Sequence, residues 1–416
     1  MLTLTADAWL LFATRGIRLF AYGSLSVVLV FYLVALGLSE SQIGLLLTLT
    51  LAGDVLVSLF LTTRADRMGR RRTLMAGAAL MAAAGLAFAA TGSFWWLVLA
   101  GTIGVISPSG HEVGPFLSIE QAALSHVVSD DDRTRVFAWY TLTGSMATAL
   151  GALAAGTLTQ VLQRPAMPPL AAYRSVVLLY AALGAALAVM FSRLSRAAEA
   201  ATLGEKRVFR RSLAGLSGLD RSRRVVVELA ALFALDSFAG GFVVQSFAAY
   251  WFYLRFGVNP ATLGAIFFWA NILAGVSALV AARLAARFGL IWTMVATHLP
   301  SNVLLIMVPL MPTLPMAIVV LWVRFSISQM DVPARQSYIM AVVSPDERSA
   351  AGGITNVART LGAAISPLFV GFMFARPSLI NLPFFIAGTL KIAYDLLLYR
   401  AFATRDVEPA SGFKSR

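Results

Sequence analysis

The chain of 416 residues contains no cysteine and only three histidines. Without cysteine there is no disulfide, thiol nucleophile, thiolate metal site or CxxCH haem attachment. The HExxH, GxxxxGK[ST] and GxGxxG patterns are also absent, which excludes the metalloprotease, P-loop ATPase and dinucleotide-binding classes that these motifs mark. We therefore expect no metal, no cofactor and no enzymatic activity.

Charged residues are scarce as well. They make up 13% of the chain, against about 25% in soluble domains, while hydrophobic residues reach 59% and the mean hydropathy is +0.79. Apolar runs of about twenty residues, long enough to cross the hydrocarbon, recur along the chain. Such runs must be helical, because lipid satisfies no backbone hydrogen bond. The composition favours an all-α integral membrane protein over a soluble helical protein with a very large core.

The apolar runs predict twelve transmembrane helices. We place them at residues 9–36, 42–63, 73–91, 94–127, 134–160, 173–193, 225–254, 261–283, 291–309, 314–343, 349–375 and 379–402. A polar stretch divides them six and six. We therefore expect an N-terminal six-helix bundle at 1–195, a cytoplasmic linker at 196–224, and a C-terminal bundle with a short cytoplasmic tail at 225–416.

Positive charge gathers in alternate loops. The loop after the second predicted helix holds five arginines between Arg64 and Arg72, and the linker holds a run of cations from Lys206 to Arg224. Loops 37–41, 91–93, 259–260 and 309–312 are nearly uncharged. Because basic loops stay in the cytoplasm, we expect a multi-pass protein of the inner or plasma membrane with both termini cytoplasmic. We therefore attribute the net charge of +13 to the basic cytoplasmic loops of a membrane protein. We expect membrane lipids, and no nucleic acid, as partners. A secondary role of the linker in binding anionic lipid or nucleic acid stays open.

The chain repeats itself. A shift of 215 positions places residues 120–156 on 335–371 without a gap, and the polar matches cluster around one charged loop: Gln121 on Gln336, Ser129 on Ser344, Asp131 on Asp346, Arg133 on Arg348, and Gly156 on Gly371. Chance matches in apolar sequence are mostly Ala and Leu. The pattern predicts a duplication into two pseudo-symmetric bundles, a plan of transporters whose substrate binds where the halves meet.

The loop after the second helix reads Thr62-Thr63-Arg64-Ala65-Asp66-Arg67-Met68-Gly69-Arg70-Arg71-Arg72-Thr73-Leu74. It resembles the GxLaDrxGrkxxl signature between helices 2 and 3 of the major facilitator superfamily, and the segment 344–349 resembles that family's loop between helices 10 and 11. The resemblance implies this family's fold and transport by alternating access. It also implies a conformational latch at Asp66, Arg67, Gly69 and Arg70 that holds the cytoplasmic side shut. A purely topological cluster of cations is the alternative.

Ionisable residues inside membrane helices are costly, at about 2.5 kcal/mol or more on insertion scales, and usually face a cavity or a partner. Arg15 and Arg18 share one face of the first helix with Tyr22; Arg15 alternatively snorkels to the interface. In the fourth predicted helix, Pro108, Gly110, Gly114 and Pro115 predict a break that contains Glu112. Glu120 pairs either with its repeat partner Arg335 or with Arg133 or Arg135 in the adjoining loop.

In the second half, Asp331 and Arg335 are spaced to neutralise one another at i and i+4, and Lys391 and Asp395 predict a second internal pair of this kind. The predicted substrate-binding residues are Arg18, Tyr22, Asn271, Asn302, Arg335, Gln336, Asn356 and Arg359. The predicted proton-coupling residues are Glu112, Glu120, Asp236 and Asp331.

Arginines slightly outnumber acids within the predicted spans, and the planar guanidinium suits carboxylate and phosphate. The sequence therefore predicts a monomeric secondary transporter of a small anionic or zwitterionic organic solute, coupled to protons. A proton-driven exporter of cationic or hydrophobic drugs is the alternative within the class. A non-transporting membrane receptor or embedded enzyme is the alternative of another class.

Overall fold

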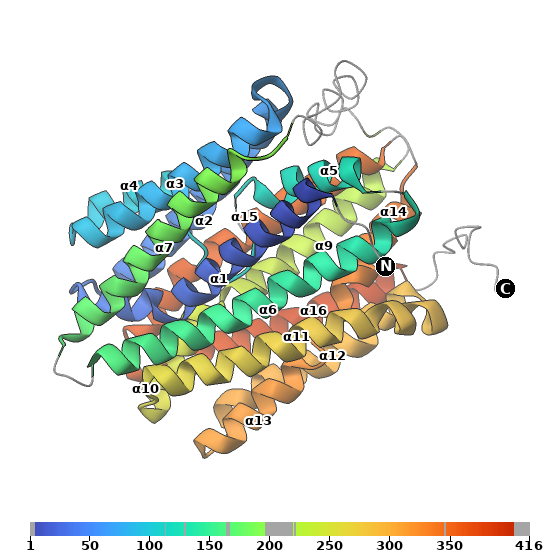
Figure 1. Ribbon diagram of the computed structural model, residues 1–416. Helices are drawn as coiled ribbons and strands as arrows, with labels where there is room; N and C mark the ends of the chain where they lie inside the picture. The colour runs from blue at the N-terminus through green and yellow to red at the C-terminus, as the bar shows by residue number, and fades with distance from the viewer. Residues whose placement is uncertain are drawn as a thin grey trace. The chain divides into compact units, whose positions relative to one another are not determined.

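The computed structural model describes residues 5–112, 114–128, 130–163, 167–195, 219, 222–344 and 347–402. Within those ranges all regular structure is helical (Figure 1). The predicted all-α fold is thereby confirmed.

The described part of the first half contains seven α-helices. They are α1 (Ala6–Ala35), α2 (Glu40–Met68), α3 (Arg70–Ala90), α4 (Phe94–Ile103), α5 (Phe116–Val127), α6 (Asp130–Gln163) and α7 (Pro169–Phe191). The described part of the second half contains α9 (Arg223–Gly241), α10 (Gln245–Phe256), α11 (Pro260–Phe288), α12 (Leu290–Met307), α13 (Leu314–Phe325), α14 (Asp331–Val342), α15 (Arg348–Phe374) and α16 (Leu382–Phe402), with short 3₁₀ turns at Val308–Leu310 and Pro377–Leu379.

In the described part of the chain, ten helical stretches are long and apolar enough to span a membrane, and α4 and α13 are shorter apolar helices. Together they occupy the twelve positions predicted from hydropathy. The fourth span is broken as predicted, since α4 and α5 are separated by the segment that carries Pro108 and Pro115.

Two further breaks were not predicted. The seventh span is divided into α9 and α10 after the pair Gly240-Gly241, because glycine has a low helix propensity. The backbone N–H of Ser246, in the first turn of α10, donates to the Pro108 carbonyl at 3.2 Å. The tenth span is divided into α13 and α14. Pro333 lies in the first turn of α14, where a missing N–H is tolerated, and it prevents the helix from continuing unbroken from α13.

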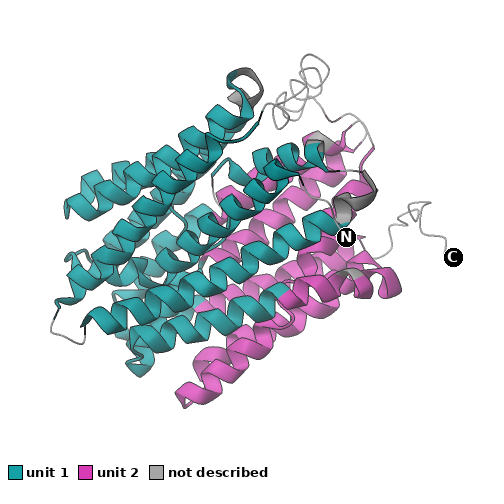
Figure 2. Cartoon of the chain, in the orientation of Figure 1, with its two compact units in different colours: residues 1–201, 242–275, 364–383 teal, residues 202–241, 276–363, 384–416 magenta. Residues whose placement is uncertain are grey.

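The chain forms two compact units (Figure 2). Unit 1 comprises 1–201, 242–275 and 364–383, and unit 2 comprises 202–241, 276–363 and 384–416. Within unit 1, α1 packs against α6 and α7, α3 packs against α7, and α2 packs against α4. The bundle boundaries at 195 and 225 stay a prediction.

The repeat is visible in the secondary structure. Helix α5 begins at Phe116 and ends at Val127, and α14 begins and ends 215 positions later, at Asp331 and Val342. The repeated charged loop itself includes Pro345 and Asp346, which lie outside the described residues.

The repeat-related residues Gly156 and Gly371 lie at two helix crossings within unit 1. A Cβ at Gly371 of α15 would stand 2.3 Å from the Glu40 carbonyl oxygen and 2.8 Å from the Cα of Gly44 on α2. A Cβ at Gly156 of α6 would stand 2.4 Å from the Pro260 carbonyl oxygen and 2.8 Å from the Cα of Gly264 on α11. Both crossings therefore require glycine for backbone contact, as is common between membrane helices.

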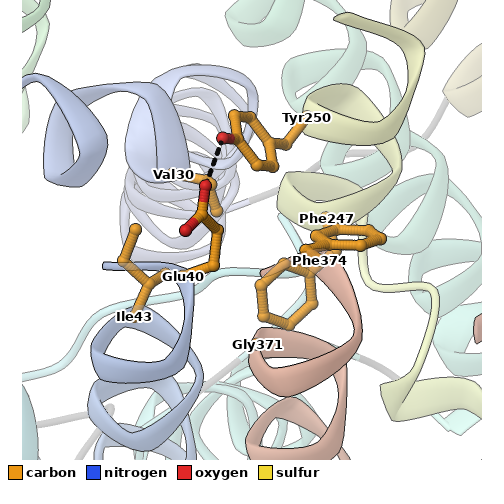
Figure 3. A pocket seen from close by; sticks show the side chains of 7 residues that line it. All are labelled: Val30, Glu40, Ile43, Phe247, Tyr250, Gly371 and Phe374. Carbon is orange, nitrogen blue, oxygen red and sulfur yellow. Dashed lines mark hydrogen bonds between the residues drawn. The ribbon is translucent and has the colours of Figure 1, made fainter. Parts of the chain in front are cut away.

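A shallow hollow lies beside the crossing of α2 and α15 (Figure 3). It is lined by Val30, Glu40, Ile43, Phe247, Tyr250, Gly371 and Phe374. The Tyr250 hydroxyl donates to Glu40 at 3.1 Å. The crossing and the hollow lie at the start of α2, next to the nearly uncharged loop 37–41.

Unit 2 has its own hydrophobic core. Buried side chains of α9, α12, α14, α15 and α16 meet in it, including Phe233, Met294, Tyr338, Ala351 and Leu398. Helix α9 therefore contributes side chains such as Phe233 to the core of unit 2.

The loops that precede α3 and α12 share a backbone feature. Gly69 and Gly289 stand directly before these helices with φ of 93° and 87°. Gly289 has ψ of 163°, a region that is essentially restricted to glycine.

This geometry gives a stability prediction for Gly289→Ala. No atom lies within 4 Å of a Cβ built at Gly289, so the cost is backbone strain alone, of about 1–3 kcal/mol. The thermal unfolding midpoint of the purified protein in detergent should fall. The matched control is Gly352→Ala within α15, where the nearest atom lies at 3.7 Å and alanine favours the helix. Equal midpoints for the two variants would contradict the prediction.

Candidate functional site

Helix α1 carries two arginines into the interior of unit 1. Arg15 and Arg18 lie about one turn apart on a face that also holds Thr14, and the exposed fractions of Arg15, Arg18 and Thr14 are 6%, 0% and 0%. Twenty of the thirty residues of α1 are buried, so these cations do not face lipid. Arg15 is therefore buried inside unit 1 and does not extend to the membrane interface.

Arg18 is held by two carboxylates. Its Nη1 and Nη2 donate to the two carboxylate oxygens of Glu120 at 2.5 and 2.7 Å, and its Nε and Nη2 donate to Glu112 at 3.2–3.3 Å. Arg15 adds a contact of 2.5 Å to Glu112. The guanidinium of Arg18 also stacks over the Phe116 ring, 4.6 Å from its centroid. Bidentate pairing of this kind is the strong form of the arginine–carboxylate contact.

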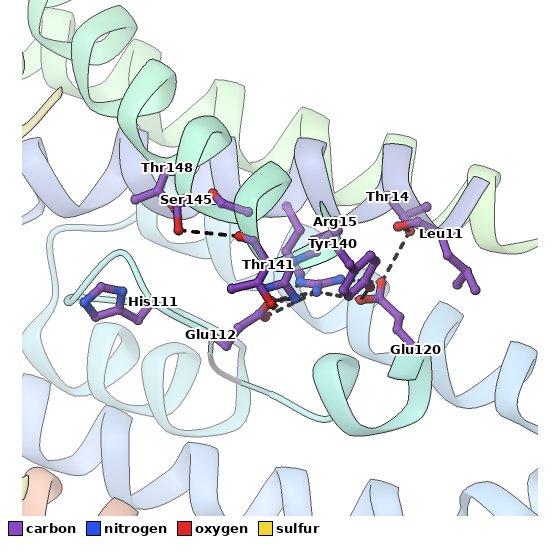
Figure 4. A network of polar contacts seen from close by, with 12 residues as sticks. Leu11, Thr14, Arg15, His111, Glu112, Glu120, Tyr140, Thr141, Ser145 and Thr148 are labelled. Carbon is purple, nitrogen blue, oxygen red and sulfur yellow. Dashed lines mark hydrogen bonds and ion pairs between the residues drawn. The ribbon is translucent and has the colours of Figure 1, made fainter. Parts of the chain in front are cut away.

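The broken fourth span delivers both acids to this cluster. Glu112 comes from the non-helical segment between α4 and α5, and Glu120 comes from the second turn of α5 (Figure 4). Glu120 is fully buried and also accepts hydrogen bonds from Thr14, at 3.3 Å, and from the Tyr140 hydroxyl. The cation that binds Glu120 is Arg18, a partner that neither sequence alternative named. With two arginines against two glutamates, the cluster has no net charge.

Two further predicted substrate residues belong to unit 1. Tyr22 is buried and stacks on Tyr180, with ring centroids 6.3 Å apart. Asn271 donates to Gln245 at 3.0 Å, and Gln245 donates to Ser26 of α1 at 2.7 Å. Asn271 therefore closes a neutral hydrogen-bond chain between α11, α10 and α1.

Unit 2 contains a second charged cluster, centred on Asp236 of α9. Its carboxylate accepts from Lys391 at 2.5 Å and from Arg335 at 3.3 Å, and the His298 Nε2 lies 3.8 Å away. Arg335 also pairs with Asp331 at 3.1 Å. The predicted i,i+4 pair of Asp331 and Arg335 is confirmed.

The predicted pair of Lys391 and Asp395 is wrong. Lys391 turns to Asp236, while Asp395 accepts from Asn302 at 2.9 Å and lies 2.8 Å from the His298 Nδ1. Both residues are on α16, but α9 and α12 offer closer partners than the next turn of their own helix. Asn302, predicted as a substrate residue, is fully buried and bound to Asp395.

Two arginines of unit 2 stand beside this cluster without an ion pair among the described residues. Arg324 lies in the last turn of α13 and Arg359 lies within α15, and the Nε of each is buried without a hydrogen-bond partner. Both are close enough to Asp236 to interact with it electrostatically. Arg359 was predicted as a substrate-binding residue, whereas Arg324 was not. Gln336 and Asn356 are exposed.

The side chains of Asp66 and Arg67, two of the four predicted latch residues, lie outside the described residues. Gly69 makes the turn into α3, and Arg70 is 5% exposed and donates to the Ala122 carbonyl of α5 at 3.4 Å. Arg70 therefore joins the loop to α5 within unit 1.

The acid Asp54 was not among the residues predicted from the sequence. Asp54 lies within α2 and is 5% exposed. The signal was present, since an ionisable residue within an apolar span is itself unusual.

The sequence model of one protein family, the Major Facilitator Superfamily, matches residues 11–254 of this chain and again residues 229–416. The chain belongs to this superfamily. It is a membrane transporter by family, and the family is one of transporters rather than enzymes.

A curated relative and several solved structures agree with this assignment. The "Uncharacterized membrane protein YJR124C" of Saccharomyces cerevisiae is 31% identical over 434 residues, covering 97% of this chain and 95% of that protein. A mutant of the nucleoside transporter NupG is similar in structure with a TM-score of 0.76 at 14% identity, covering 95% of this chain and 100% of that one. The D-xylose–proton symporter gives a TM-score of 0.71 at 15% identity, covering 94% and 97%. At such identities the structures show a shared fold.

Proposed function

We propose that the chain is a secondary transporter that moves a small organic anion, or a zwitterion with an anionic group, by alternating access driven by a proton gradient. The observation that carries the substrate sign is the pair of arginines, Arg324 and Arg359, that lack a carboxylate partner among the described residues of unit 2. Both side chains are half-buried, and a buried guanidinium N–H without a hydrogen-bond partner is costly. A bound anion offsets that cost.

The charge inventory of unit 2 supports this sign. Arg324, Arg335, Arg359 and Lys391 face the acids Asp236, Asp331 and Asp395 within the described residues. Asp331 and Asp236 already occupy Arg335 and Lys391. Arginine presents a planar fork that matches a carboxylate or phosphate, so Arg324 and Arg359 are the available donors.

The cluster of Arg15, Arg18, Glu112 and Glu120 in unit 1 has a different role from that of Arg324 and Arg359. Arg18 is bound by two carboxylates, so an anionic substrate reaches it only by displacing one of them. Arg335 is bound by two acids in unit 2 in the same way. We propose these two arginines as residues that exchange partners during transport, with Arg359 and Arg324 as the first contact of the anion.

We further propose that both termini lie on the cytoplasmic side, that the protein acts as a monomer in a cell membrane, and that the loop with Asp66 and Arg67 holds the cytoplasmic side closed. The alternation of basic and uncharged loops supports the orientation. The connection of Arg70 to α5 supports a role of this loop in holding helices together.

The test is transport by purified protein in proteoliposomes. Thermal-shift screening against succinate, lactate, glutamate, glucose 6-phosphate and tetraphenylphosphonium first identifies a stabilising ligand. Uptake of that ligand is then measured with and without an inward proton gradient. If tetraphenylphosphonium alone is bound and accumulated, the proposal of an anionic substrate is overturned in favour of a cation exporter. If a ligand is bound but not transported, a receptor is favoured.

Replacement of Arg359 should weaken the substrate interaction specifically. Losing a charge-assisted contact of about 1.5–3 kcal/mol predicts a rise of about tenfold to a hundredfold in the KM of Arg359→Gln. The same direction is expected for Arg324→Gln. The matched control is Arg376→Gln on an exposed loop beyond α15, where the guanidinium stacks on Phe372 at 3.8 Å. Unchanged KM in both Arg324→Gln and Arg359→Gln would remove these residues from the site.

A further inference from the structure

Asp54 differs in its partners from the four acids predicted to carry protons. It lies near the middle of the 23-residue apolar stretch Glu40–Thr62 and is 5% exposed. Its carboxyl group accepts a hydrogen bond from the Ser58 hydroxyl at 3.4 Å, and the backbone N–H of Gly114 lies close enough to interact with it electrostatically. Among the described residues it forms no ion pair.

The four acids predicted to carry protons all have cationic partners. Glu112 and Glu120 bind Arg15 and Arg18, and Asp236 and Asp331 bind Arg335. A cation within about 4 Å stabilises the ionised carboxylate, so each of these acids must break an ion pair before it takes up a proton. Asp54 has no such pair to break.

The surroundings of Asp54 contain no substitute for a cation among the residues that the structure describes. Helix α4, which packs closely on α2, has no ionisable side chain, and the ionisable groups of α3 are the arginines at its first turn. The titratable groups that interact with Asp54 from α1 and α7 are the buried phenols Tyr22 and Tyr180. A carboxylate taken out of water without a counter-charge is costly, and the usual outcome is the neutral acid.

We propose that Asp54 is the carboxyl group that binds and releases the coupling proton of transport. The step is the formation or loss of one O–H bond on its carboxylate, with the proton taken from or given to water on one side of the membrane. The proposal rests on the proton coupling put forward above and assigns it to a residue outside both charged clusters.

The position of Gly114 gives this proton a structural consequence. Gly114 has φ of 79° and follows Glu112 by two residues in the broken span. Its N–H is close enough to interact with the Asp54 carboxyl group, and an ionised carboxylate attracts an N–H more strongly than the neutral acid does. Loss of the proton is therefore expected to draw α2 toward the segment that carries Glu112.

Asp54→Asn separates substrate movement from proton movement. The amide keeps the size and the neutral form of the side chain but binds no proton. With the ligand found in the thermal-shift screen, exchange of labelled for unlabelled ligand across the proteoliposome membrane should persist. Accumulation driven by a proton gradient should fall by about tenfold or more, because the neutral amide cannot carry the coupled charge. Asp7→Asn is the matched control: Asp7 is a buried acid of the same unit whose carboxylate accepts from Ser195 at the end of the bundle, and it should keep both activities.

A measurement that needs no transport tests the protonation itself. Infrared difference spectra between about pH 5 and about pH 9, on either side of the titration of a buried carboxyl group, should show the band of a protonated carboxyl in the wild-type protein and in Asp7→Asn. The band should be absent or halved in Asp54→Asn. An unchanged band in Asp54→Asn, or gradient-driven accumulation at the wild-type level, would overturn the proposal.

The two proposals fail in different ways. If the wild-type protein accumulates its ligand without regard to the proton gradient, the proton coupling of the proposed function is wrong, and Asp54 is not a coupling site whatever its spectrum. If the wild-type protein is driven by protons while Asp54→Asn is driven equally well, only the assignment to Asp54 is wrong.

Discussion

Gly371→Leu should abolish net transport. The side chain would have to occupy the space where α15 touches α2, with its Cβ 2.3 Å from a backbone oxygen and 2.8 Å from the Cα of Gly44. Neither is the end of a flexible side chain, so the helices must separate. Gly156→Leu meets the same obstacle at the Pro260 carbonyl and Gly264, at 2.4 and 2.8 Å. Both crossings lie next to the nearly uncharged loops, which we assign to the outer side.

We propose that these two glycine crossings hold the outer side of unit 1 closed. A variant that cannot close it cannot complete an alternating-access cycle, so uptake should fall to the level of empty liposomes for each leucine variant. Gly352→Leu is the control on the same helix α15, because its nearest neighbour is the flexible end of Met340 at 3.7 Å. That variant should retain transport.

Labelling checks the cause of the loss. The chain has no cysteine, so Val30→Cys introduces a single thiol at a position that is 2% exposed and lines the hollow beside Gly371. An impermeant maleimide added outside the cell should label it faster when Gly371→Leu is also present. Wild-type transport by Gly371→Leu, or unchanged labelling, would rule out the crossing as an outer closure.

Arg18→Met is expected to be the most destabilising single change in unit 1. It removes the cation shared by Glu112 and Glu120 and leaves the fully buried Glu120 with only Thr14 and Tyr140 as donors among the described residues. Removing one partner of a buried pair costs about 3–5 kcal/mol. After heating in detergent, the fraction of the protein that elutes as a monodisperse peak in size-exclusion chromatography should be much smaller than for the wild type.

A second substitution tests whether charge is the reason. Arg18→Met combined with Glu120→Gln removes the uncompensated charge and should recover a large part of the lost stability. Arg18→Met with Glu112→Gln should recover less, because the Glu112 side chain is 17% exposed and keeps Arg15. The exposed pair of Arg224 and Glu228, at 3.0 Å, supplies the control: Arg224→Met should change stability little. If Arg18→Met is as stable as the wild type, or if Glu120→Gln adds to the damage, the cluster does not stabilise the fold in this way.

The sequence alone determined the class, the twelve spans, the repeat, the break in the fourth span and the pairing of Asp331 with Arg335. These features depend on hydropathy, on proline and glycine, and on residues a few positions apart, all of which are local in the chain. The breaks in the seventh and tenth spans had their local signals too, in Gly240-Gly241 and Pro333. They were missed because continuous hydropathy outweighed them.

Only the tertiary structure decided which buried charges meet. Arg18 binds Glu120 across 102 positions, and Lys391 binds Asp236 across 155 positions although Asp395 is one turn away. The rotation of each helix about its axis is set by side-chain packing along its whole length, and that rotation selects the partner. For the same reason the sequence could show that Asp54 lies within a membrane span, but only the packing of α2 against α4 and the broken segment leaves that acid without a cation among the described residues.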